Sequence, residues 1–329
     1  MNVATNLSYS DKKVLVTGAG GSIGSGLVAS LTEAGCNQLV LVDHSEYLLF
    51  QTLQHFKYSS YLADLRDKQR ISEIFEIERP DIVFHAAALK HVPLMEANPT
   101  EAIQTNIRGT LHLIESSLAV GVGRFVFISS DKAVRPASIM GATKRIGEML
   151  CYHYRDVSKT VFTAVRFGNV LHSSGSVIPL FDEQIRMGGP VTVTHRDMER
   201  YFMSVPQACR LVMQTGEMGQ SGEIYLLDMG EPVRIYDLAR SMVLASGKMP
   251  DVDIEIQVTG LRPGEKLKEE IYTDQDATEP TEVVGIRLVK MNPNSTDFET
   301  NLAQLLEARK SNEIRSYLSA LITDYKAQS

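Results

Sequence analysis

The stretch Val14-Leu15-Val16-Thr17-Gly18-Ala19-Gly20-Gly21-Ser22-Ile23-Gly24 decides how this chain folds. A short apolar run, typical of a buried strand, leads into a glycine-rich turn, and a helical pattern begins at Ser22. Glycines let the chain turn sharply and let its backbone approach a pyrophosphate at the N-terminus of the helix. Such turns also occur for packing alone, so the pattern needs support from elsewhere in the sequence.

Asp43 gives that support, because it lies nineteen residues beyond Gly24, at the end of the next apolar run. An acidic side chain there accepts hydrogen bonds from the adenosine ribose of a dinucleotide and repels a 2'-phosphate. The residues that follow supply no arginine to bind such a phosphate. The sequence therefore predicts NAD as the cofactor, bound by Gly18, Gly20, Gly21, Ser22, Ile23, Gly24, Asp43, His44 and Ser45.

Short apolar runs alternate with helical patterns as far as Gly168. Each run is nearly unbroken, as expected of parallel strands that are covered on both faces. The predicted strands are 14–16, 39–42, 58–62 (the weakest), 82–84, 125–128 and 161–167. The predicted helices are 22–33, 46–55, 68–77, 100–119 and 139–154. The fold class is therefore α/β, with a Rossmann-type doubly wound parallel sheet.

The rhythm changes after Gly168, where loops rich in glycine, proline and serine separate short predicted strands at 191–194 and 254–258. We expect residues 1–170 to form an NAD-binding domain. Residues 171–329 should form mainly a smaller α/β substrate-binding lobe, with C-terminal helices within 300–325. A strand at 223–227 and a helix at 236–245 indicate a segment, about 204–246, that returns to the first domain.

Composition excludes several classes of protein. The formal net charge is -7, without a dense Lys/Arg cluster, so nucleic acid is not expected as a partner. Cys36, Cys151 and Cys209 lack metal-binding spacing and are expected to be buried in a reducing compartment, with no metal bound. No apolar stretch approaches the roughly 20 residues that cross a bilayer, and the start is not signal-like, so a cytoplasmic protein is expected.

The block Ser129-Ser130-Asp131-Lys132-Ala133 follows the fifth predicted strand, at the edge of the sheet where this type of fold places its chemistry. In isolation, an adjacent Asp and Lys would be an exposed pair worth under about 1 kcal/mol. A predicted helix that begins near Met140 places Lys144 one turn further on the same face. This context favours an acid–base pair beside the cofactor.

These blocks, with residues 85–93, 166–170 and 262–266, resemble bacterial UDP-N-acetylglucosamine 4,6-dehydratases of the polysaccharide-biosynthesis type. Those proteins are extended short-chain dehydrogenase/reductases. The resemblance covers roughly residues 13–271 and combines several motifs in one order. Most relatives with the methionine-containing motif also carry an N-terminal membrane region, which this chain is expected to lack.

The resemblance implies an internal redox cycle. NAD+ takes hydride from sugar C4, water leaves across C5 and C6, and hydride returns to C6. Lys132 is implied to abstract the C5 proton and Asp131 to protonate the leaving C6 hydroxyl, which requires both pKa values to shift toward the working pH. The implied product is a UDP-2-acetamido-2,6-dideoxy-4-hexulose for bacterial surface glycans, and Met140 points to retention of the C5 configuration.

Met140 occupies the position that tyrosine holds in the usual Tyr-x-x-x-Lys motif. A thioether cannot accept the proton of the C4 hydroxyl. Either catalysis is lost and the chain is an NAD-binding sensor or scaffold, or the proton leaves through Ser130 and Asp131. We favour the second alternative because the other motifs are intact. A C5-inverting dehydratase and a nucleotide-sugar 4-epimerase are the nearest rival activities.

Further cofactor contacts are expected beyond the glycine turn. Lys144 is implied by the resemblance to hold the nicotinamide ribose. Asp64 either binds the adenine amino group or caps a helix. Asn106 either supports the site, as an asparagine in this helix often does, or is a solvated helix residue. The expected set is Asp64, Leu65, Ala86, Ala87, Ala88, Lys90, Asn106 and Lys144.

The second lobe is expected to hold a UDP-sugar substrate. Asn169, Ser176 and the start of a helix near Val177 can offer donors to a diphosphate. The rigid turn after Arg262 presents this side chain to phosphate, with Glu265 near the uridine ribose. Arg200 either contacts phosphate or forms a surface ion pair, and Lys90 and His91 either face the ligands or cap helices. The expected set is Lys90, His91, Asn169, Ser176, Val177, Pro179, Thr192, Arg200, Arg262 and Glu265.

The resemblance also implies a homo-oligomer, a dimer or larger. Relatives pair the helices that correspond to residues 100–119 and 139–154 across a subunit interface.

Overall fold

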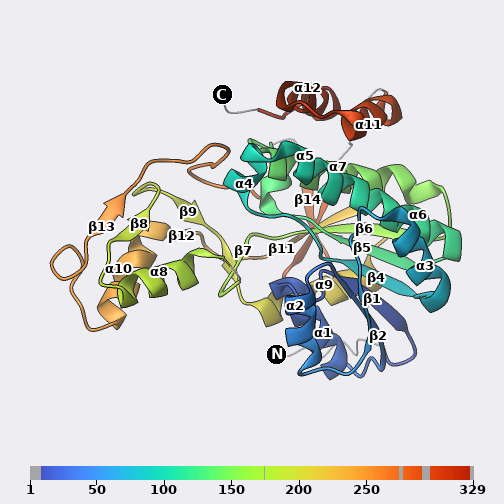
Figure 1. Ribbon diagram of the computed structural model, residues 1–329, viewed down its shortest axis with the longest axis horizontal. Coiled ribbons are helices and arrows are strands. Elements are labelled where there is room, and N and C mark those ends of the chain that lie inside the picture. The colour runs from blue at the N-terminus through green and yellow to red at the C-terminus, as the bar shows by residue number, and fades with distance from the viewer. Residues whose placement is uncertain (1–8, 174, 274–276, 291–296, 327–329) are drawn as a thin grey trace.

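A largely parallel sheet forms the centre of the larger of two lobes (Figure 1). The structure, a computed structural model, describes residues 9–173, 175–273, 277–290 and 297–326. The strands of this sheet are β1 (Lys13–Thr17), β2 (Gln38–Asp43), β3 (Ser59–Leu62), β4 (Ile82–His85), β5 (Arg124–Ile128), β6 (Val161–Arg166), β11 (Glu223–Leu227), β14 (Ala277–Pro280) and β15 (Ile286–Lys290). Their spatial order is β14-β15-β11-β6-β5-β4-β1-β2-β3.

The strand order reverses at β1, which pairs in parallel with both β2 and β4. The chain first extends the sheet through β2 and β3, then returns to place β4, β5 and β6 on the other side of β1. Such a switch point opens a crevice at the carboxyl ends of β1 and β4, where open α/β sheets bind their ligands. The predicted Rossmann-type doubly wound fold is therefore confirmed.

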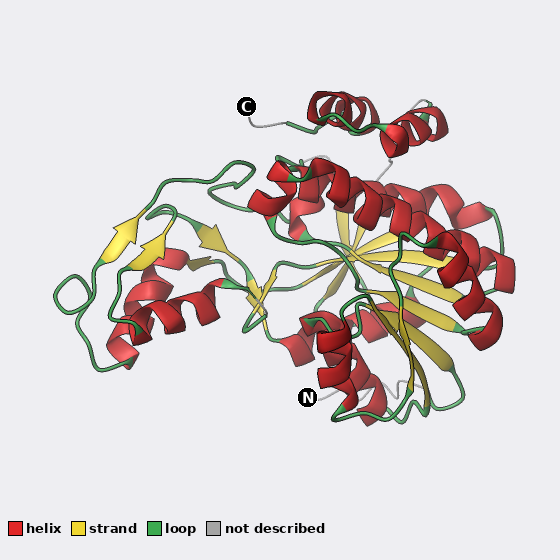
Figure 2. Cartoon of the chain, viewed as in Figure 1, coloured by secondary structure: helices red, strands yellow, loops and turns green. Residues whose placement is uncertain are grey.

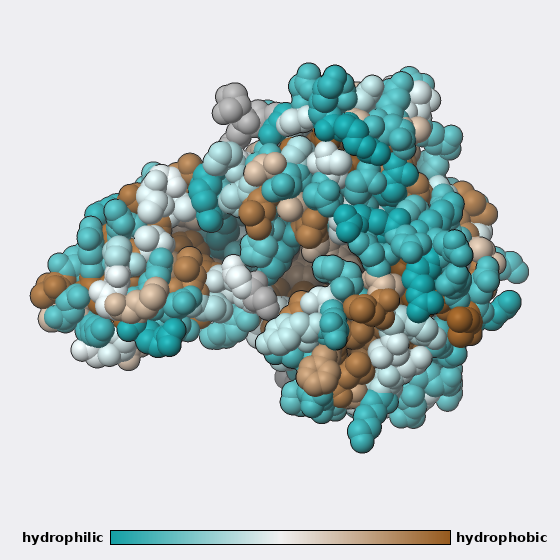
Figure 3. All heavy atoms as spheres, in the orientation of Figure 1, coloured by the Kyte–Doolittle hydropathy of each residue, from teal (hydrophilic) through white to brown (hydrophobic). Residues whose placement is uncertain are grey.

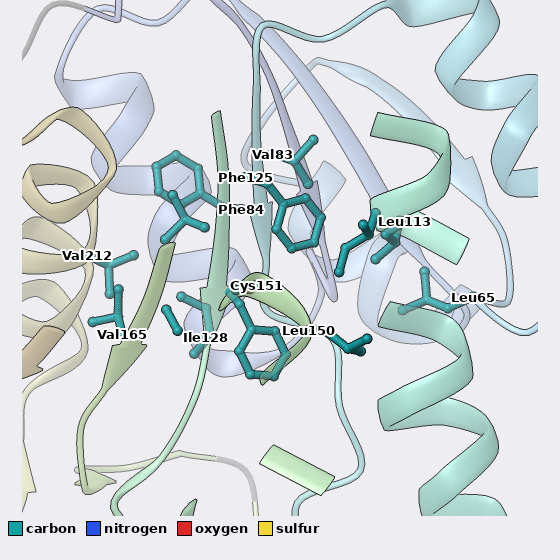
Figure 4. Packing of buried hydrophobic residues seen from close by; sticks show 14 of the residues in the cluster. Leu65, Val83, Phe84, Leu113, Phe125, Ile128, Leu150, Cys151, Val165 and Val212 are labelled. Carbon is teal, nitrogen blue, oxygen red and sulfur yellow. The ribbon is translucent and has the colours of Figure 1, made fainter. Parts of the chain in front are cut away.

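Helices cover both faces of the sheet (Figure 2). They are α1 (Ser22–Glu33), α2 (Glu46–Leu53), α3 (Lys68–Glu78), α4 (Val92–Ala97), α5 (Pro99–Ala102), α6 (Gly109–Val120), α7 (Ile139–His153) and α9 (Val205–Met218), with short 3-10 turns η2 (Asp131–Ala133) and η3 (Tyr154–Asp156). Figure 4 shows apolar side chains of α6, α7 and α9, among them Leu113, Leu150 and Val212, gathered around Phe84 and Phe125 of the sheet. The three cysteines are buried and free, and their predicted burial is thus confirmed.

Both edges of the sheet show why some strands are hard to predict. None of the four residues of the edge strand β3 is buried, which explains its weak apolar pattern. The strands β14 and β15 were not predicted at all. They extend the other edge in antiparallel register, and most of their side chains lie at or near the surface.

The predicted helix 100–119 is confirmed as a continuous helical stretch, but its middle is not α-helical. Between α5 and α6 the chain forms a π-helix, η1 (Ile103–Arg108), which widens the turn around Asn106. Such π-turns are rare and occur mostly as single turns inside α-helices, often at functional sites. Sequence periodicity does not reveal them, because the residues on either side keep a helical pattern.

The narrower lobe has a hydrophobic cluster of its own, which includes Phe181, Val191, Tyr236 and Ile254. It contains α8 (Val177–Arg186), α10 (Ile235–Ala245) and the parallel pair β8 (Val191–Val193) and β13 (Ile256–Val258). Two further short pairs, β7 (Asn169–Val170) with β10 (Phe202–Met203) and β9 (Glu199–Arg200) with β12 (Val233–Arg234), lie between the lobes (Figure 1).

The segment predicted to return to the first domain, about 204–246, does so only in part. Helix α9 packs against α1, where a side chain at Gly26 would overlap Val205, and β11 joins the large sheet beside β6. Helix α10, which was predicted to return with them, instead packs against α8 and β8 of the narrower lobe. Its amphipathic pattern does not distinguish one apolar partner from another.

Two C-terminal helices, α11 (Phe298–Glu307) and α12 (Ser311–Leu321), pack on η1, α5 and α7. The carbonyl oxygen of Leu306 accepts hydrogen bonds from Gln104 and Arg108 of η1, at 3.1 and 2.8 Å. These helices thus cover part of the surface that sequence considerations assigned to a subunit interface. Of the helices within the described ranges, none combines the length and apolar character that crossing a membrane requires.

A buried ion pair joins α7 to the end of β6. Arg166 donates two hydrogen bonds of 2.7 Å to the carboxylate of Glu148, and neither side chain is exposed. Ser129, which directly follows β5, donates to the same carboxylate at 2.6 Å. Burial opposes ionisation of Glu148, but the neighbouring guanidinium of Arg166 outweighs it, so the pKa of Glu148 is lowered.

We predict that Glu148→Gln lowers the free energy of unfolding by about 3–5 kcal/mol at neutral pH, because Arg166 would stay buried without its counter-ion. Since the pKa of Glu148 is lowered in the folded state, wild-type protein loses this stabilisation as the pH falls through that pKa. The difference between variant and wild type should therefore narrow in acid. Urea unfolding at several pH values measures it.

The control is Glu279→Gln, which removes the same charge from the exposed pair between Glu279 and Lys290. Its effect should stay within about 0.5 kcal/mol. Equal effects of the two substitutions would contradict the role given to the buried pair.

Candidate active site

The glycine turn is built for close backbone approach. Gly18 has a φ of 64°, and a Cβ there would lie 2.7 Å from the Cα of Ala87. A Cβ at Gly24 would overlap the carbonyl oxygen of Gly18, so helix α1 can begin directly against the turn. Ser22 and Ile23 form the first turn of α1. The turn and the loop after β4 thus line the crevice at the switch point together.

Asp43 is buried at the end of β2 and ties the glycine turn to the next helix. Its carboxylate accepts hydrogen bonds from the amide groups of Gly20 and Ser45, each at 2.9 Å. Ser45 caps α2, and the imidazole of His44 is largely exposed, 3.5 Å from the Asp43 carboxylate. The acidic side chain predicted from spacing therefore lies beside the glycine turn.

Asp64 and Leu65 follow β3, at the same edge of the sheet as Asp43 at the end of β2. The carboxylate of Asp64 pairs with Arg66, which lowers the pKa of Asp64. The alternative that Asp64 caps a helix is wrong, because Asp67 caps α3 through the amide group of Arg70. Leu65 is buried against Gly109, the first residue of α6.

Asn106 holds the loop after β4 in place. Its side chain accepts a hydrogen bond from the Leu89 amide at 2.8 Å and donates to the Leu89 carbonyl and to Thr143, both at 2.9 Å. It is 2% exposed, so the alternative of a solvated helix residue is wrong. The amides of Ala86 and Ala87 bind Thr17 of β1. Ala88 and Lys90 lie in the same loop, and burial lowers the pKa of Lys90.

His85 is a buried residue to which the sequence motifs assign no role. Its imidazole lies 2.8 Å from the hydroxyl groups of both Thr17 and Thr110. Because Thr110 donates its own proton to the Asn106 carbonyl, it accepts from His85, and Thr17 donates to the other ring nitrogen. Burial, with a contribution from Lys144, lowers the pKa of His85 to about 3, so a neutral imidazole links β1 to the first turn of α6.

Asp131 and Lys132 lie in the short turn η2 at the end of β5. One oxygen of Asp131 accepts hydrogen bonds from Ser130 at 2.8 Å and from Lys132 at 3.0 Å. The other oxygen is buried, and no hydrogen-bond partner for it exists within the described ranges. The alternative of an exposed surface pair is wrong, since the Asp131 side chain is 0% and the Lys132 side chain 19% exposed.

Lys132 has two further acceptors. Asn169 of β7 lies 3.3 Å from its Nζ atom, and Glu269 lies 3.5 Å away. Burial opposes the charge of Lys132, but Asp131 and Glu269 outweigh it, so the pKa of Lys132 is raised. Glu269 was not anticipated from the sequence, because no spacing links it to Lys132 and only the tertiary fold brings the two together.

Arg200 lies on the other side of Glu269, at 3.8 Å. Its guanidinium group donates to the carbonyl oxygens of Glu199, Lys266 and Leu267, and the residue is 7% exposed. The alternative of a surface ion pair is therefore wrong, because the side chain is buried. The three hydrogen bonds use three of the five N–H donors of the guanidinium group, so the phosphate contact of Arg200 stays a prediction.

Met140 and Lys144 lie on the buried face of α7, as predicted. Met140 is 3% exposed, so a thioether occupies the place of the usual phenol. The Nζ atom of Lys144 donates to the carbonyl of Ile128 at 2.8 Å and lies 4.9 Å from the centre of the Phe127 ring. Burial lowers the pKa of Lys144 to about 8.

Several of the residues predicted for substrate binding meet between the lobes, where the surface is hollowed (Figure 3). A side chain at Gly175 would touch the imidazole of His91, so the start of α8 lies beside the loop after β4. His91 precedes α4 without capping it. Burial and then the charges of Lys90 and Arg262 lower its pKa, which indicates that basic groups gather here.

Helix α8 presents its N-terminus near His91, with Ser176 before its first residue, Val177. The hydroxyl oxygen of Ser176 is buried, and within the described ranges it has no hydrogen-bond partner. Pro179 is exposed in the first turn of the helix.

The remaining predicted residues already have protein partners. Arg262 and Glu265 bind each other at 2.6 Å. Thr192 of β8 is hydrogen-bonded to Gln184.

The fold and the order of these elements define an extended short-chain dehydrogenase/reductase. Within that class, the chain belongs to the family described as polysaccharide biosynthesis protein, whose model matches residues 14–291. It is 51% identical over 275 residues to the capsular polysaccharide biosynthesis protein CapD of Staphylococcus aureus. The matched region covers 81% of this chain and 46% of CapD. The chain thus spans about half the length of this relative.

Other comparisons cover nearly whole proteins. An inverting UDP-N-acetylglucosamine 4,6-dehydratase of Campylobacter jejuni is 31% identical over 277 residues, 82% of this chain and 80% of that protein. The solved structure of Pen from Bacillus thuringiensis has a TM-score of 0.79 at 33% identity, over 86% of this chain and 88% of that one. A UDP-glucose 4-epimerase of Thermus thermophilus, solved in complex with NAD, has a TM-score of 0.71 over 79% and 90% of the two chains; at 24% identity it shows the fold alone.

We predict that Asn106→Leu lowers the free energy of unfolding by at least about 2 kcal/mol, because the amide and carbonyl groups of Leu89 lose their buried partner. Amide hydrogen exchange at Leu89 should accelerate as well. Urea unfolding and exchange mass spectrometry measure the two effects. The exposed Asn312→Leu in α12 is the control and should change stability by less than about 0.5 kcal/mol. Unchanged exchange at Leu89 would contradict the role of Asn106.

Proposed function

We propose that this protein is an NAD-dependent UDP-N-acetylglucosamine 4,6-dehydratase that retains the configuration at C5. The larger lobe would hold the cofactor, with residues 1–170 as its main part, and the narrower lobe the nucleotide-sugar. The product would be a UDP-2-acetamido-2,6-dideoxy-4-hexulose, a precursor of bacterial surface glycans. The family membership and the likeness to the Campylobacter jejuni dehydratase support this proposal.

The observation that carries the proposal is the state of Asp131. One carboxylate oxygen is fixed by Ser130 and Lys132, while the other is buried without a partner among the described residues. A buried oxygen of this kind is costly unless a ligand group binds it. A sugar hydroxyl would satisfy it. An acid–base pair is what a dehydration requires and what a binding protein does not need.

Proton transfers follow from the chain's own residues. Ser130 can pass the proton of the C4 hydroxyl to Asp131, since their oxygens lie 2.8 Å apart. Protonation removes the negative charge of Asp131, so this side chain no longer favours the ammonium form of Lys132. Lys132 is 19% exposed, so it can lose its proton to solvent and then take the proton from C5. Asp131 returns its proton to the leaving C6 hydroxyl, which forms water. When C6 receives the hydride, the protonated Lys132 gives a proton back to C5, and exchange of its ammonium protons with D2O would place deuterium there.

The residues around the switch point fit NAD. The glycine turn offers close backbone approach, and Asp43 lies beside it at the end of β2. Lys144 would hold the nicotinamide ribose, and Asn106 would support the site by fixing the loop after β4. When bound, NAD+ supplies an acceptor for the C4 hydride and returns the hydride to C6. Because the thioether of Met140 cannot accept a proton, the proton of the C4 hydroxyl would leave through Ser130 and Asp131 instead.

The narrower lobe offers donors for a diphosphate. The buried hydroxyl of Ser176, the N-terminus of α8 and the basic groups Lys90 and Arg262 surround one region. Arg262 would exchange its partner Glu265 for phosphate, which frees that carboxylate for the ribose. Arg200 would approach the diphosphate with the N–H donors that its backbone partners leave over.

The direct test is to incubate the protein with UDP-N-acetylglucosamine in D2O, with and without added NAD+, and to follow the sugar by NMR and mass spectrometry. A 4-keto-6-deoxy product with deuterium at C5 is expected, and its coupling pattern distinguishes retention from inversion. An isomer of unchanged mass would indicate a 4-epimerase. Unchanged sugar, despite demonstrated binding of both ligands, would indicate a sensor or scaffold.

We predict that Asp131→Asn and Lys132→Met each lower turnover by about 10²–10⁴-fold, because each removes a proton donor or acceptor. Binding of NAD+, measured by calorimetry, should remain within a few-fold of wild type. The control is Lys268→Met, which removes an exposed lysine from the nearby pair with Glu199 and should leave turnover unchanged. Full turnover in either site variant would exclude the proposed roles.

We predict that Asp43→Asn weakens NAD+ binding by about tenfold or more, because a charge-assisted hydrogen bond to the ribose is lost and the amide would face the Gly20 N–H. Asp67→Asn is the matched control, since Asn caps a helix as well as Asp does. Calorimetric titration with NAD+ measures both. Equal affinities for Asp43→Asn and wild type would place the adenosine elsewhere.

A further inference from the structure

The segment of residues 262–271, which we call the crossing segment, contacts Arg200 and Glu199 of β9 and also the residues that follow β5. On one side its carbonyl groups bind Arg200, and the amide of Glu199 donates to the Leu267 carbonyl at 3.0 Å. On the other side Lys266 donates to the carbonyl of Val134 at 3.0 Å, one residue after the turn η2. The crossing segment therefore touches both lobes at the acid–base pair.

Glu269 is the member of this segment that enters the cluster. It is 8% exposed, with its carboxylate 3.5 Å from Lys132 and 3.8 Å from Arg200. Its neighbour Glu270 points elsewhere and pairs with Arg135 and Lys266 at a half-exposed position. Of two adjacent acidic residues, one is thus buried against Lys132 and the other lies at the rim.

The ammonium group of Lys132 has three protons and three protein acceptors within reach: Asp131, Asn169 and Glu269. Asp131 belongs to the same turn as Lys132, Asn169 to the connection between the lobes, and Glu269 to the crossing segment. Arg200 is the other cation that faces this cluster. Two carboxylates and two cations leave the cluster without net charge, as burial requires.

We propose that Glu269 is a positioning residue for the dehydration. From the crossing segment, its carboxylate holds the amine of Lys132 in the position from which Lys132 exchanges a proton with the sugar. This inference rests on the proposed function, in which Lys132 exchanges a proton with C5. Asp131 changes its charge during the reaction, whereas Glu269 does not contact the predicted relay through Ser130. Glu269 thus keeps its contact with Lys132 while Asp131 gains and loses a proton.

The test uses the full chain and two substitutions, Glu269→Gln and Glu270→Gln. Competitive labelling of amines with acetic anhydride over a range of pH, read out by mass spectrometry, follows the titration of Lys132 without any turnover. Glu269 favours the ammonium form, so its neutralisation should move the midpoint of Lys132 labelling to lower pH and increase its labelling near neutral pH several-fold. Glu270→Gln should leave the labelling unchanged.

In the dehydration assay, Glu269→Gln should lower kcat by roughly tenfold, the loss expected for one charge-assisted contact, with little change in KM. Its activity should also begin to rise at lower pH than that of wild type. A purely structural role would lower stability or binding without moving the labelling midpoint. Unchanged labelling in Glu269→Gln, or the same shift in Glu270→Gln, would overturn the inference.

Failure of the proposed function is distinguishable from failure of the inference. If no dehydration occurs in wild type but Lys132 labelling shifts in Glu269→Gln alone, the reaction is wrong and the pairing stands. If dehydration occurs and the variant keeps both the labelling and the pH profile of wild type, the reaction stands and the role of Glu269 is wrong.

Discussion

The buried ion pair between Glu148 and Arg166 is the interaction on which the candidate active site of this protein depends. Glu148 lies one helical turn after Lys144, Ser129 lies two residues before Asp131, and Arg166 lies three residues before Asn169. A single carboxylate therefore ties together the helix that carries Lys144 and the strand ends that lead to Asp131 and Asn169. Breaking a buried pair is costly because the remaining charge has no water to replace its partner. The positions of Asp131, Lys144 and Asn169 are consequently determined by electrostatics as well as by apolar packing.

Much of the fold follows from local pattern, because the central strands are buried on both faces and their apolar runs are short and uninterrupted. The glycine turn, Asp43, and the block from Ser130 to Lys132 are readable for a similar reason: each occupies a fixed place relative to a strand. Where pattern is diluted by exposure, as in β3, β14 and β15, it predicts weakly or not at all.

Other features depend on partners that are distant in sequence. The π-helix around Asn106 does not alter the hydrophobic periodicity of the sequence. Helix α10 belongs to the narrower lobe because the apolar surface that it packs against lies there. The burial of Glu269 also could not be predicted from the sequence, since two adjacent acidic residues are typical of a solvated surface. Its burial is decided by the crossing segment, which the two lobes hold between them.

The C-terminal helices have a consequence for how the protein folds. Gln104 and Leu306 are separated by 202 residues, yet they bond directly, and the π-helix that carries Asn106 is completed by the part of the chain that is synthesised late. Contacts between such distant residues form slowly, because a long loop must close before they stabilise anything. On the ribosome, the sheet and its glycine turn can assemble well before this helix receives its final support. The support of this π-helix thus depends on a contact that closes a loop of about 200 residues, whereas the glycine turn depends on neighbours close in sequence.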